Sequence, residues 1–479
     1  MAHDADVIVV GSGAGGATLA HACAQAGKRV LVLERGARLA SVSSVHDERA
    51  TLIDKQPYDD RRIDVNGTPR RLYMGGVLGG SSALFGAALL RPTAADFQPG
   101  RSYGHRLPRE LWDWPIDAAA MAPFYAEAER LYGVSSSPGA PLHPVNQRMV
   151  DANLAHGLQP FRLPLAIDFA RCTRCPACPG YLCPTGARYS SAQLLEQSGR
   201  AVQVRTNVEV ERIVLDGTGR PDGVEAIDRV AGRRAVFRAH RYVLAAGAIG
   251  SPLILLRSGL HHPLMGRNYM MHYSPIVVGI FARRIGGDQA FIKEVGFSDY
   301  YLGSRDFPHK MGLVQSLPVP GPLMLAKATS RFVPGFLLNW LRARLLPLVG
   351  IIEDLPDPRN CVSWGADGRP RLQHRFSGYD LARGRRLAEL SGGILKRAGA
   401  ALCLSSGFAS EEHVAHQCGT LRFGTDATHA VLDADCRMFQ HPNVFVVDGS
   451  FMPTSLGVGP ALTIIANALR VARVVAKEA

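Results

Sequence analysis

Continuous apolar runs alternate with helical patterns near both ends of the chain. An apolar run at residues 6–10 ends in a glycine-rich turn, a helical pattern follows, and a second apolar run covers residues 30–33. A third run at residues 242–246 again leads into a glycine turn and a helix, and a fourth at 444–447 precedes a final helix at 461–476. Such runs are typical of parallel strands that are buried on both faces. The pattern predicts a doubly wound sheet assembled from distant parts of the chain.

The first glycine turn carries a dinucleotide-binding pattern. Gly11, Gly13 and Gly16 follow the first strand in the order G-x-G-x-x-G, and Glu34 follows the second strand. Gly13 lets the backbone approach a pyrophosphate, and Gly16 lets the next helix pack closely enough to aim its positive N-terminus at that charge. Glu34 is placed to accept a hydrogen bond from a ribose hydroxyl. An ordinary tight turn would explain the glycines alone, but the strand, glycines, helix and acid together indicate a bound dinucleotide.

The middle of the chain has a different pattern. Residues 107–135 contain an amphipathic helix, residues 202–216 alternate as in a sheet, and residues 273–405 are irregular and sheet-like. We therefore expect an α/β protein with two lobes, a Rossmann-like nucleotide-binding lobe and an inserted, sheet-based substrate lobe. The expected nucleotide-binding domain comprises residues 1–100, 190–272 and 410–479. The expected substrate domain comprises residues 101–189 and 273–409.

Charge and composition exclude some classes of function. The 479 residues include 54 Lys and Arg against 41 Asp and Glu, a formal net charge of +13. The arginines are scattered, so an ordinary basic surface is the simplest interpretation, while an acidic substrate, an anionic membrane surface or an acidic redox partner stays open. Only 7% of residues are aromatic and no basic module is recognisable, which excludes nucleic-acid binding. No secretory pattern precedes the first strand, so we expect a cytoplasmic protein.

An apolar and basic stretch covers residues 331–352. Pro334 and Pro347 interrupt it, so we expect that it does not span a bilayer. Three interpretations stay open: it makes a peripheral contact with a membrane surface, it caps a hydrophobic substrate channel, or it packs inside the substrate lobe.

Four cysteines lie close together at Cys172, Cys175, Cys178 and Cys183. Four thiols at this spacing can converge on one metal centre, as in ferredoxin-type runs, although the last gap is longer by one residue. A four-cysteine zinc site is a rival interpretation, but its ligands usually come in two separated pairs. A disulfide pair or free thiols without a metal is the third interpretation, and a reducing cytoplasm disfavours it.

Further motifs follow the fingerprint in a fixed order along nearly the whole chain. They are Gly79-Gly80-Ser81-Ser82 with Asp96-Phe97, Trp114-Pro115-Ile116, Gly266-Arg267-Asn268 with His272, Glu353-Asp354, His416-Gln417-Cys418-Gly419-Thr420, Asp448-Gly449-Ser450, and Pro460-Ala461-Leu462. In this order the motifs resemble the glucose-methanol-choline (GMC) family of flavoprotein oxidoreductases. The resemblance implies that the dinucleotide is FAD.

The resemblance also implies which residues bind the cofactor. They are Gly11, Gly13, Gly16, Glu34, Gly79, Gly80, Ser81, Ser82, Val208, Asp448, Gly449, Pro460, Ala461 and Leu462. Some family members attach FAD covalently through a histidine just after the Gly-Gly-Ser-Ser turn, but this chain has Ala83-Leu84-Phe85 there, so we expect non-covalent FAD. Some sugar dehydrogenases of the family carry a cysteine-bound iron–sulfur cluster, which makes Cys172, Cys175, Cys178 and Cys183 candidate ligands.

His416 matches the family's catalytic histidine, which removes a hydroxyl proton while a hydride passes from the carbinol carbon to flavin N5. A neutral imidazole suits this work because it titrates near neutral pH. We expect His272, in contrast, to have a structural role. The chain departs from the family at Gly459, where members usually carry a second His or Asn. Either His416 acts alone, or a group of the substrate lobe or the substrate fills the gap, or the reaction is not ordinary alcohol oxidation.

The sequence therefore predicts an FAD-dependent dehydrogenase or oxidase that oxidises a small-molecule alcohol. Its electron acceptor would be oxygen, a quinone or a cytochrome. The rival hypotheses are a flavin-retaining lyase of the same fold, in which no hydride moves, and an electron-transfer subunit whose flavin and iron–sulfur cluster serve a partner enzyme.

Overall fold

A six-stranded sheet forms the centre of the first half of the molecule. The computed structural model describes residues 3–39, 47–135, 141–176, 178–329, 332–406 and 411–479. The strands of this sheet follow the order β18 (Arg437–Met438), β19 (His441–Val446), β10 (Arg241–Leu244), β1 (Val7–Val10), β2 (Val30–Leu33) and β6 (Val202–Arg205). All neighbours are parallel except β18 and β19. The doubly wound sheet expected from the apolar runs is confirmed.

The register of the central strands brings distant segments to one edge. Val10 at the end of β1 lies beside Leu33 of β2 and Leu244 of β10. The three chain segments that leave these strands therefore meet at the same carboxyl edge, where open α/β sheets bind their ligands. The sheet itself is an apolar core, because every residue of β1 and β2 is buried.

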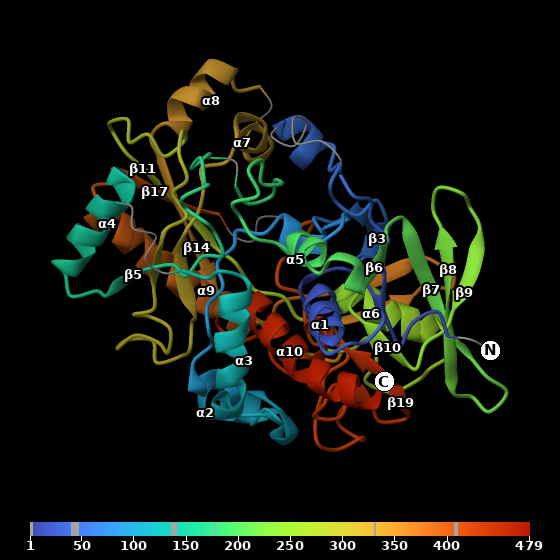
Figure 1. The fold of residues 1–479 in the computed structure, drawn as a ribbon. Helices are drawn as coiled ribbons and strands as arrows, with labels where there is room; N and C mark the ends of the chain where they lie inside the picture. The colour runs from blue at the N-terminus through green and yellow to red at the C-terminus, as the bar shows by residue number, and fades with distance from the viewer. Residues whose placement is uncertain (1–2, 40–46, 136–140, 177, 330–331, 407–410) are drawn as a thin grey trace.

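Helices pack on this sheet and on each other. Contacts join α1 (Ala14–Gln25) with α10 (Ala461–Glu478) and with α5 (Ser191–Gln197), and α10 also packs on α3 (Ala118–Leu131). α6 (Gly247–Arg257) leaves β10 through a glycine turn, as the sequence pattern predicts. α1 and α10 therefore lie side by side in the middle of the molecule (Figure 1).

A second six-stranded sheet lies beside the first in the other half of the molecule (Figure 1). Its order is β17 (Leu402–Ser406), β11 (Ile276–Ile280), β14 (Leu345–Ile351), β13 (Leu313–Ser316), β12 (Val295–Phe297) and β5 (Pro160–Arg162), all antiparallel. α9 (Gly378–Arg397) covers it, with α4 (Pro144–Leu154) packed on α9. This sheet is the expected sheet-based lobe.

Two smaller sheets complete the fold. One joins β15 (Cys361–Trp364), β16 (Pro370–Gln373), β3 (Arg62–Val65) and β4 (Thr68–Arg71), and the other β7 (Val208–Leu215), β8 (Pro221–Asp228) and β9 (Arg234–Phe237). The first pairs residues 62–71 with residues 361–373, which the sequence assigns to different domains. The domain boundaries stay a prediction.

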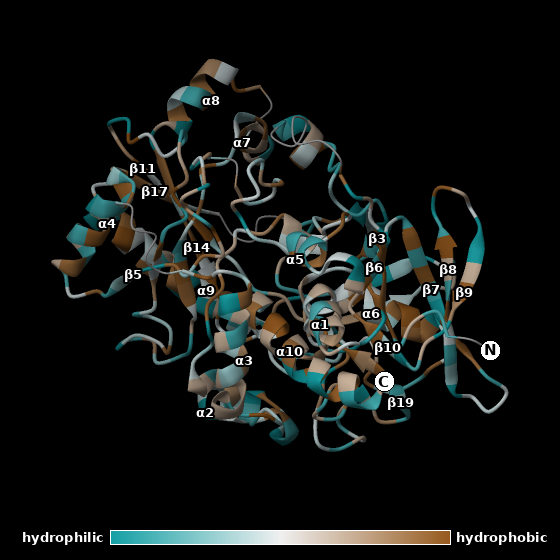
Figure 2. Ribbon diagram, in the orientation of Figure 1, coloured by the Kyte–Doolittle hydropathy of each residue, from teal (hydrophilic) through white to brown (hydrophobic). Residues whose placement is uncertain are grey.

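The apolar stretch at residues 331–352 divides into two parts. β14 is buried along its whole length inside the second sheet. α8 (Gly335–Arg342) instead lies at the edge of the molecule near α7 (Pro322–Ala328) (Figure 1). α2 (Pro99–Tyr103) lies on the opposite side of the molecule in the same view. α8 exposes 76% of Phe336 and 53% of Trp340, and Figure 2 shows brown segments on it. In the described parts of the chain no helix is long and apolar enough to cross a membrane. Peripheral membrane contact stays a prediction.

Gly15 provides a test of how α1 packs. A Cβ atom at Gly15 would lie 1.9 Å from the carbonyl oxygen of Val447, whereas a Cβ atom at Gly13 would meet no atom within 4 Å. We predict that Gly15→Ala lowers the free energy of unfolding of the apoprotein by about 1–3 kcal/mol or more, because the strand and helix must separate. Gly13→Ala is the matched control and should change it by less than about 0.5 kcal/mol. Denaturant unfolding measures both, and equal effects would contradict this packing.

Candidate active site

Ser12 connects the first glycine turn to the other predicted nucleotide-binding residues. Its backbone N–H donates to Glu34 Oε2 at 2.8 Å and its hydroxyl donates to the same oxygen at 2.6 Å. The hydroxyl oxygen accepts the N–H of Gly79 at 2.8 Å. The hydroxyl of this fully buried side chain therefore joins three segments that the sequence predicts to bind one cofactor. Ser12 stands inside the glycine fingerprint, but nothing in the pattern predicts its role.

The glycines of the fingerprint have two different roles. Added Cβ atoms at Gly11 and Gly16 would lie 2.5 Å and 2.1 Å from backbone carbonyl oxygens, so these glycines permit close packing. Gly13 instead faces open space, and an added Cβ on Gly80 would lie 3.2 Å from the Gly13 Cα. Gly80 thus packs against Gly13, and the open space beside Gly13 is a gap at the sheet edge.

Two helix N-termini are open toward this region. α1 begins after Gly13 and α10 begins after Pro460, and neither has a side-chain cap or an acidic residue in its first turn. A Cβ atom at Gly15 would also lie 3.2 Å from Ile464 in the first turn of α10, so the two helix starts are neighbours. Ala461 and Leu462 begin α10. Unpaired N–H groups at such positions bind anions and polar ring atoms.

The structure gives the remaining predicted cofactor residues more specific positions. Val208 lies beside Glu34, and its N–H donates to the Glu34 carbonyl at 2.9 Å, so only its carbonyl and side chain are available to a nucleotide. Asp448 accepts from the N–H groups of Gly247 and Ser450, both at 2.9 Å, and holds the turn at Gly449. Burial raises the pKa of both Glu34 and Asp448 above the ordinary carboxyl value.

Ser81 and Ser82 support the second glycine turn. The hydroxyl of Ser82 donates to the Gly79 carbonyl at 2.7 Å and accepts the N–H of Ser191 at 3.1 Å. The hydroxyl of Ser81 accepts the N–H of Gly75 at 3.0 Å. Both serine hydroxyls therefore hold backbone in place.

The cysteine loop does not form a metal centre in the described residues. Burial raises the pKa values of the Cys172, Cys175 and Cys178 thiols. Burial would also raise that of Cys183, but the N–H of Arg188 and the hydroxyl of Thr185 lower it below the ordinary value. Among the described residues, which leave out Ala177 of this loop, no three His, Cys, Asp or Glu side chains are arranged to hold a metal ion. The iron–sulfur and zinc interpretations stay predictions.

His416 and His272 form a hydrogen-bonded pair. Their Nδ1 atoms are 2.9 Å apart, and the His272 Nε2 lies 2.8 Å from the carbonyl oxygen of Leu456. Because a carbonyl only accepts, His272 carries its hydrogen on Nε2 and presents Nδ1 as an acceptor when it is neutral. His416 must then donate from Nδ1. Its Nε2 is left without a hydrogen and can accept a proton.

Both imidazoles are held in the neutral form. Burial lowers the pKa of His272 to about 4. Burial, together with His272 and the ammonium group of Lys293, holds the pKa of His416 well below its ordinary value. The assignment of hydrogens therefore applies across the neutral pH range. The sequence motif predicts His416 alone; the structure adds its hydrogen bond to His272, whose structural role stays a prediction.

Gly459 lies directly in front of the free nitrogen of His416. A Cβ atom at Gly459 would be 3.4 Å from His416 Nε2 and 3.5 Å from Cε1. The side chain of the His or Asn that the family usually has at this position would therefore contact His416 directly. In this chain that space is left for another group.

A buried network of charges holds the loop that fixes His272. Lys310 Nζ lies 2.5 Å from Asp96 Oδ1 and 2.6 Å from Glu353 Oε2, and all three side chains are at most 1% exposed. Glu353 Oε1 accepts the N–H of Leu456 at 3.1 Å. The carboxylate thus holds one side of the Leu456 peptide, and His272 binds the carbonyl of the same residue. Lys310 has no local sequence signal, because its partners lie far away in the chain.

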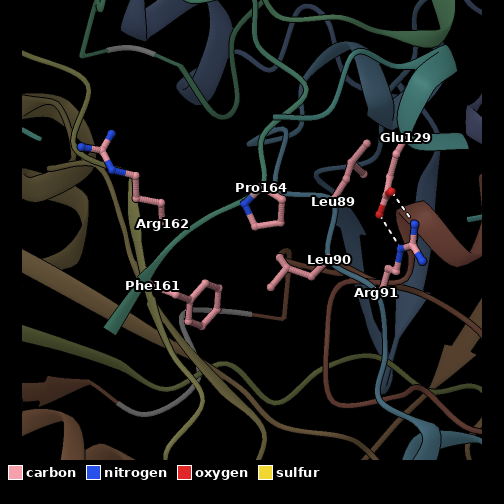
Figure 3. Close-up of a pocket in the computed structure, with 7 residues that line it drawn as sticks. All are labelled: Leu89, Leu90, Arg91, Glu129, Phe161, Arg162 and Pro164. Atoms are coloured by element: carbon pink, nitrogen blue, oxygen red, sulfur yellow. Dashed lines mark hydrogen bonds and ion pairs between the residues drawn. The ribbon is translucent and has the colours of Figure 1, made fainter. Parts of the chain in front are cut away.

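Two cavities lie on the side of this loop that faces the second sheet. The larger has a volume of about 570 Å³ and is drawn in Figure 3, where Arg91 pairs with Glu129 at 2.6 Å and Arg162 lies opposite. The second, of about 400 Å³, shares Leu90, Arg91 and Phe161 with it and reaches Val458, next to Gly459. None of the predicted site residues lines either cavity, so both lie beside the site rather than in it.

Comparison with known proteins assigns the family. The models of the N-terminal and C-terminal regions of GMC oxidoreductases match residues 5–274 and 356–468. Similar curated proteins include the 6'''-hydroxyparomomycin C oxidase of Streptomyces lividus, 31% identical over 99% of this chain and 91% of that protein. The 2-methyl-1,2-propanediol dehydrogenase of Mycolicibacterium austroafricanum is 26% identical over 98% of this chain and 94% of that protein. The chain belongs to the GMC oxidoreductase family.

Solved structures show the same fold. Pyridoxine 4-oxidase from Mesorbium loti superimposes with a TM-score of 0.71 at 20% identity, over 98% of this chain and 99% of that protein. An Aspergillus oryzae RIB40 formate oxidase, whose structure concerns FAD modification, gives a TM-score of 0.71 at 16% identity, over 99% of this chain and 98% of that protein. The glycine gap and the two uncapped helix starts fit the FAD that this flavoprotein family uses.

Gly13 allows the cofactor site to be tested separately from folding. We predict that Gly13→Ala raises the Kd for FAD at least about tenfold, because its methyl group enters the open space at the start of α1 and displaces the pyrophosphate. Titration of apoprotein with FAD, followed by flavin fluorescence, measures this. Gly217→Ala, in the turn between β7 and β8, is the matched control, since a Cβ atom there also meets no atom within 4 Å. Unchanged FAD binding by Gly13→Ala would show that the pyrophosphate lies elsewhere.

Proposed function

We propose that this protein oxidises an alcohol group of a small molecule, with FAD bound non-covalently and with His416 as the base. The observation that carries the proposal is the direction of the His416 side chain. Its unprotonated Nε2 faces the space over Gly459, while its Nδ1 donates to His272. A base that is neutral, oriented and next to open space is what removal of a hydroxyl proton needs.

The fit of FAD rests on the glycine gap and the helix starts described above. When bound, FAD supplies the acceptor for the hydride that leaves the carbinol carbon. Ala83, Leu84 and Phe85 follow the second glycine turn and carry no group that could form a covalent link to it. No step of the proposal needs a metal at the cysteine loop.

The residues of the site have separate tasks in this reaction. His416 Nε2 accepts the hydroxyl proton, and the positive charge that forms on the ring is stabilised through the Nδ1–H donated to His272. His272 acts as a positioning residue: its bond to the Leu456 carbonyl stops it from turning and so fixes which nitrogen of His416 is free. His416 itself has a φ of +66°, an uncommon backbone conformation outside glycine that functional sites often contain.

Removal of the base should slow the reaction without loss of the cofactor. We predict that His416→Ala binds FAD normally and slows substrate-dependent bleaching of the flavin by about 100-fold or more. Anaerobic stopped-flow absorption measures the rate, and the flavin content of the purified variant is the control. Turnover of substrate without any bleaching in the parent protein would instead favour a lyase.

The low pKa values of the two histidines predict the pH dependence of the reaction. A base works only when it is unprotonated, and the pKa of His416 lies well below the ordinary value of 6.5. The rate of flavin reduction by a neutral alcohol should therefore be flat from about pH 7.5 down to about pH 6 and fall only in more acidic solution. A profile that loses half its rate near pH 6.5 would mean that His416 titrates like a free imidazole.

A further inference from the structure

Lys293 brings a positive charge from the second sheet to the candidate active site. It lies two residues before β12, and a Cβ atom at Gly86 would be 2.3 Å from its Nζ atom. Gly86 lies four residues after the turn of Gly79 to Ser82, directly after Ala83, Leu84 and Phe85. Lys293 is also one of the charges that lower the pKa of His416. Its amine therefore lies close to both the second glycine turn and the base.

The charge on Lys293 has no carboxylate partner in the described part of the chain, and Cys178 is the acidic group that raises its pKa. No ion pair or hydrogen bond joins its Nζ atom to any described residue, and no carboxylate is among the groups that shift its pKa. The next residue, Glu294, is already engaged: it accepts from Asn146 Nδ2 at 2.7 Å and lies 3.3 Å from Arg174. The carboxylate nearest in sequence therefore does not neutralise Lys293.

Arg188 adds a second positive charge near Lys293. Its guanidinium is buried and, among the described residues, binds only carbonyl oxygens and the Cys178 sulfur, with Ala83 accepting at 2.6 Å. Its Nε atom has no hydrogen-bond partner among the same residues. Arg188 is also one of the charges that lower the pKa of Lys293. Two cations thus lie around the Ala83–Gly86 segment without a carboxylate, an arrangement that favours an anion.

Lys293 is partly buried and partly accessible. Burial lowers its pKa to about 8, so much of the side chain is removed from bulk water. The residue nevertheless keeps part of its accessible surface, as do His416, Gly86 and Gly459. Lys293 can therefore be reached by a small ligand while it stays close enough to His416 to affect its pKa.

We propose that Lys293 binds an acidic group of the substrate and so selects alcohols that carry a carboxylate or a similar anionic group. Lys293 comes from the second sheet. It would thereby supply the polar contact to the substrate that Gly459, which has no side chain, cannot make. The inference rests on the proposed function, because it concerns the substrate of the same site. A cationic amine on the substrate would be repelled by Lys293 and Arg188, and a neutral alcohol would gain nothing from them.

The test uses ligands that cannot be oxidised, so that binding is measured apart from turnover. The probes are straight-chain carboxylates of about two to eight carbons, their primary amides, and the alkylammonium ions of equal length. Each is titrated into the holoenzyme at pH 7 by calorimetry and, in parallel, by its perturbation of the flavin absorption spectrum. The spectrum reports binding beside the flavin and separates it from binding to the basic surface.

We expect the best carboxylate to bind about 10- to 100-fold more tightly than its amide, and the ammonium ion to bind most weakly. Lys293→Met should abolish this preference and Lys293→Arg should keep it. Lys396→Met, on the exposed surface of α9, is the control that removes the same charge elsewhere. Thermal unfolding confirms that each variant is folded, and Lys293→Arg separates loss of charge from loss of packing.

Three results would overturn the proposal. One is a preference for carboxylates that survives in Lys293→Met, and another is the absence of any preference in the parent protein. The third is binding of carboxylates that leaves the flavin spectrum unchanged, which means surface binding only. The proposed function fails on a different result. Normal flavin reduction in His416→Ala would show that His416 is not the base, and it would leave the preference for carboxylates untouched.

Discussion

The hydrogen bond from His272 to the carbonyl of Leu456 is the constraint on which the site depends. It fixes where the hydrogen of His272 lies, this fixes the donor nitrogen of His416, and the free nitrogen of His416 then faces Gly459. The constraint is maintained by charge buried far from solvent, because Glu353 and Lys310 hold the peptide of Leu456 from its other side. Burial thus does two things at once: it keeps both imidazoles neutral and it fixes their orientation.

The cofactor site depends on a different principle, the absence of side chains. Gly11 and Gly16 let α1 approach the strands, Gly13 leaves open space at the start of α1, and Gly80 packs against Gly13. Ser12 joins Glu34 and Gly79 with one hydroxyl. The N-terminal part of the site, at the first glycine turn, meets the C-terminal part around Gly459 because α1 and α10 begin side by side. The proposed base and the proposed nucleotide site come from distant parts of the chain and are thereby brought to one edge of the sheet.

The parts of the fold that sequence predicts are those governed by local patterns. The apolar runs predict β1, β2, β10 and β19, and the glycine spacing predicts the turn at Gly13. His416 is found because it stands in a motif. The sequence does not reveal what depends on long-range contacts: Lys310 between Asp96 and Glu353, the pairing of His272 with His416, and the pairing of β3 with β16 across the expected domain boundary. Residues 331–352 read as one apolar and basic stretch, yet tertiary packing buries β14 and leaves much of α8 exposed.

The central claim is that His416 is a neutral imidazole with a free Nε2. Nitrogen-15 NMR of histidine-labelled holoenzyme measures this directly, with the His416 and His272 signals assigned by their loss in His416→Gln and His272→Gln. The account predicts that at pH 7 His416 carries its hydrogen on Nδ1 and His272 carries its hydrogen on Nε2, both uncharged. A charged His416 at pH 7, or one with its hydrogen on Nε2, would contradict the account.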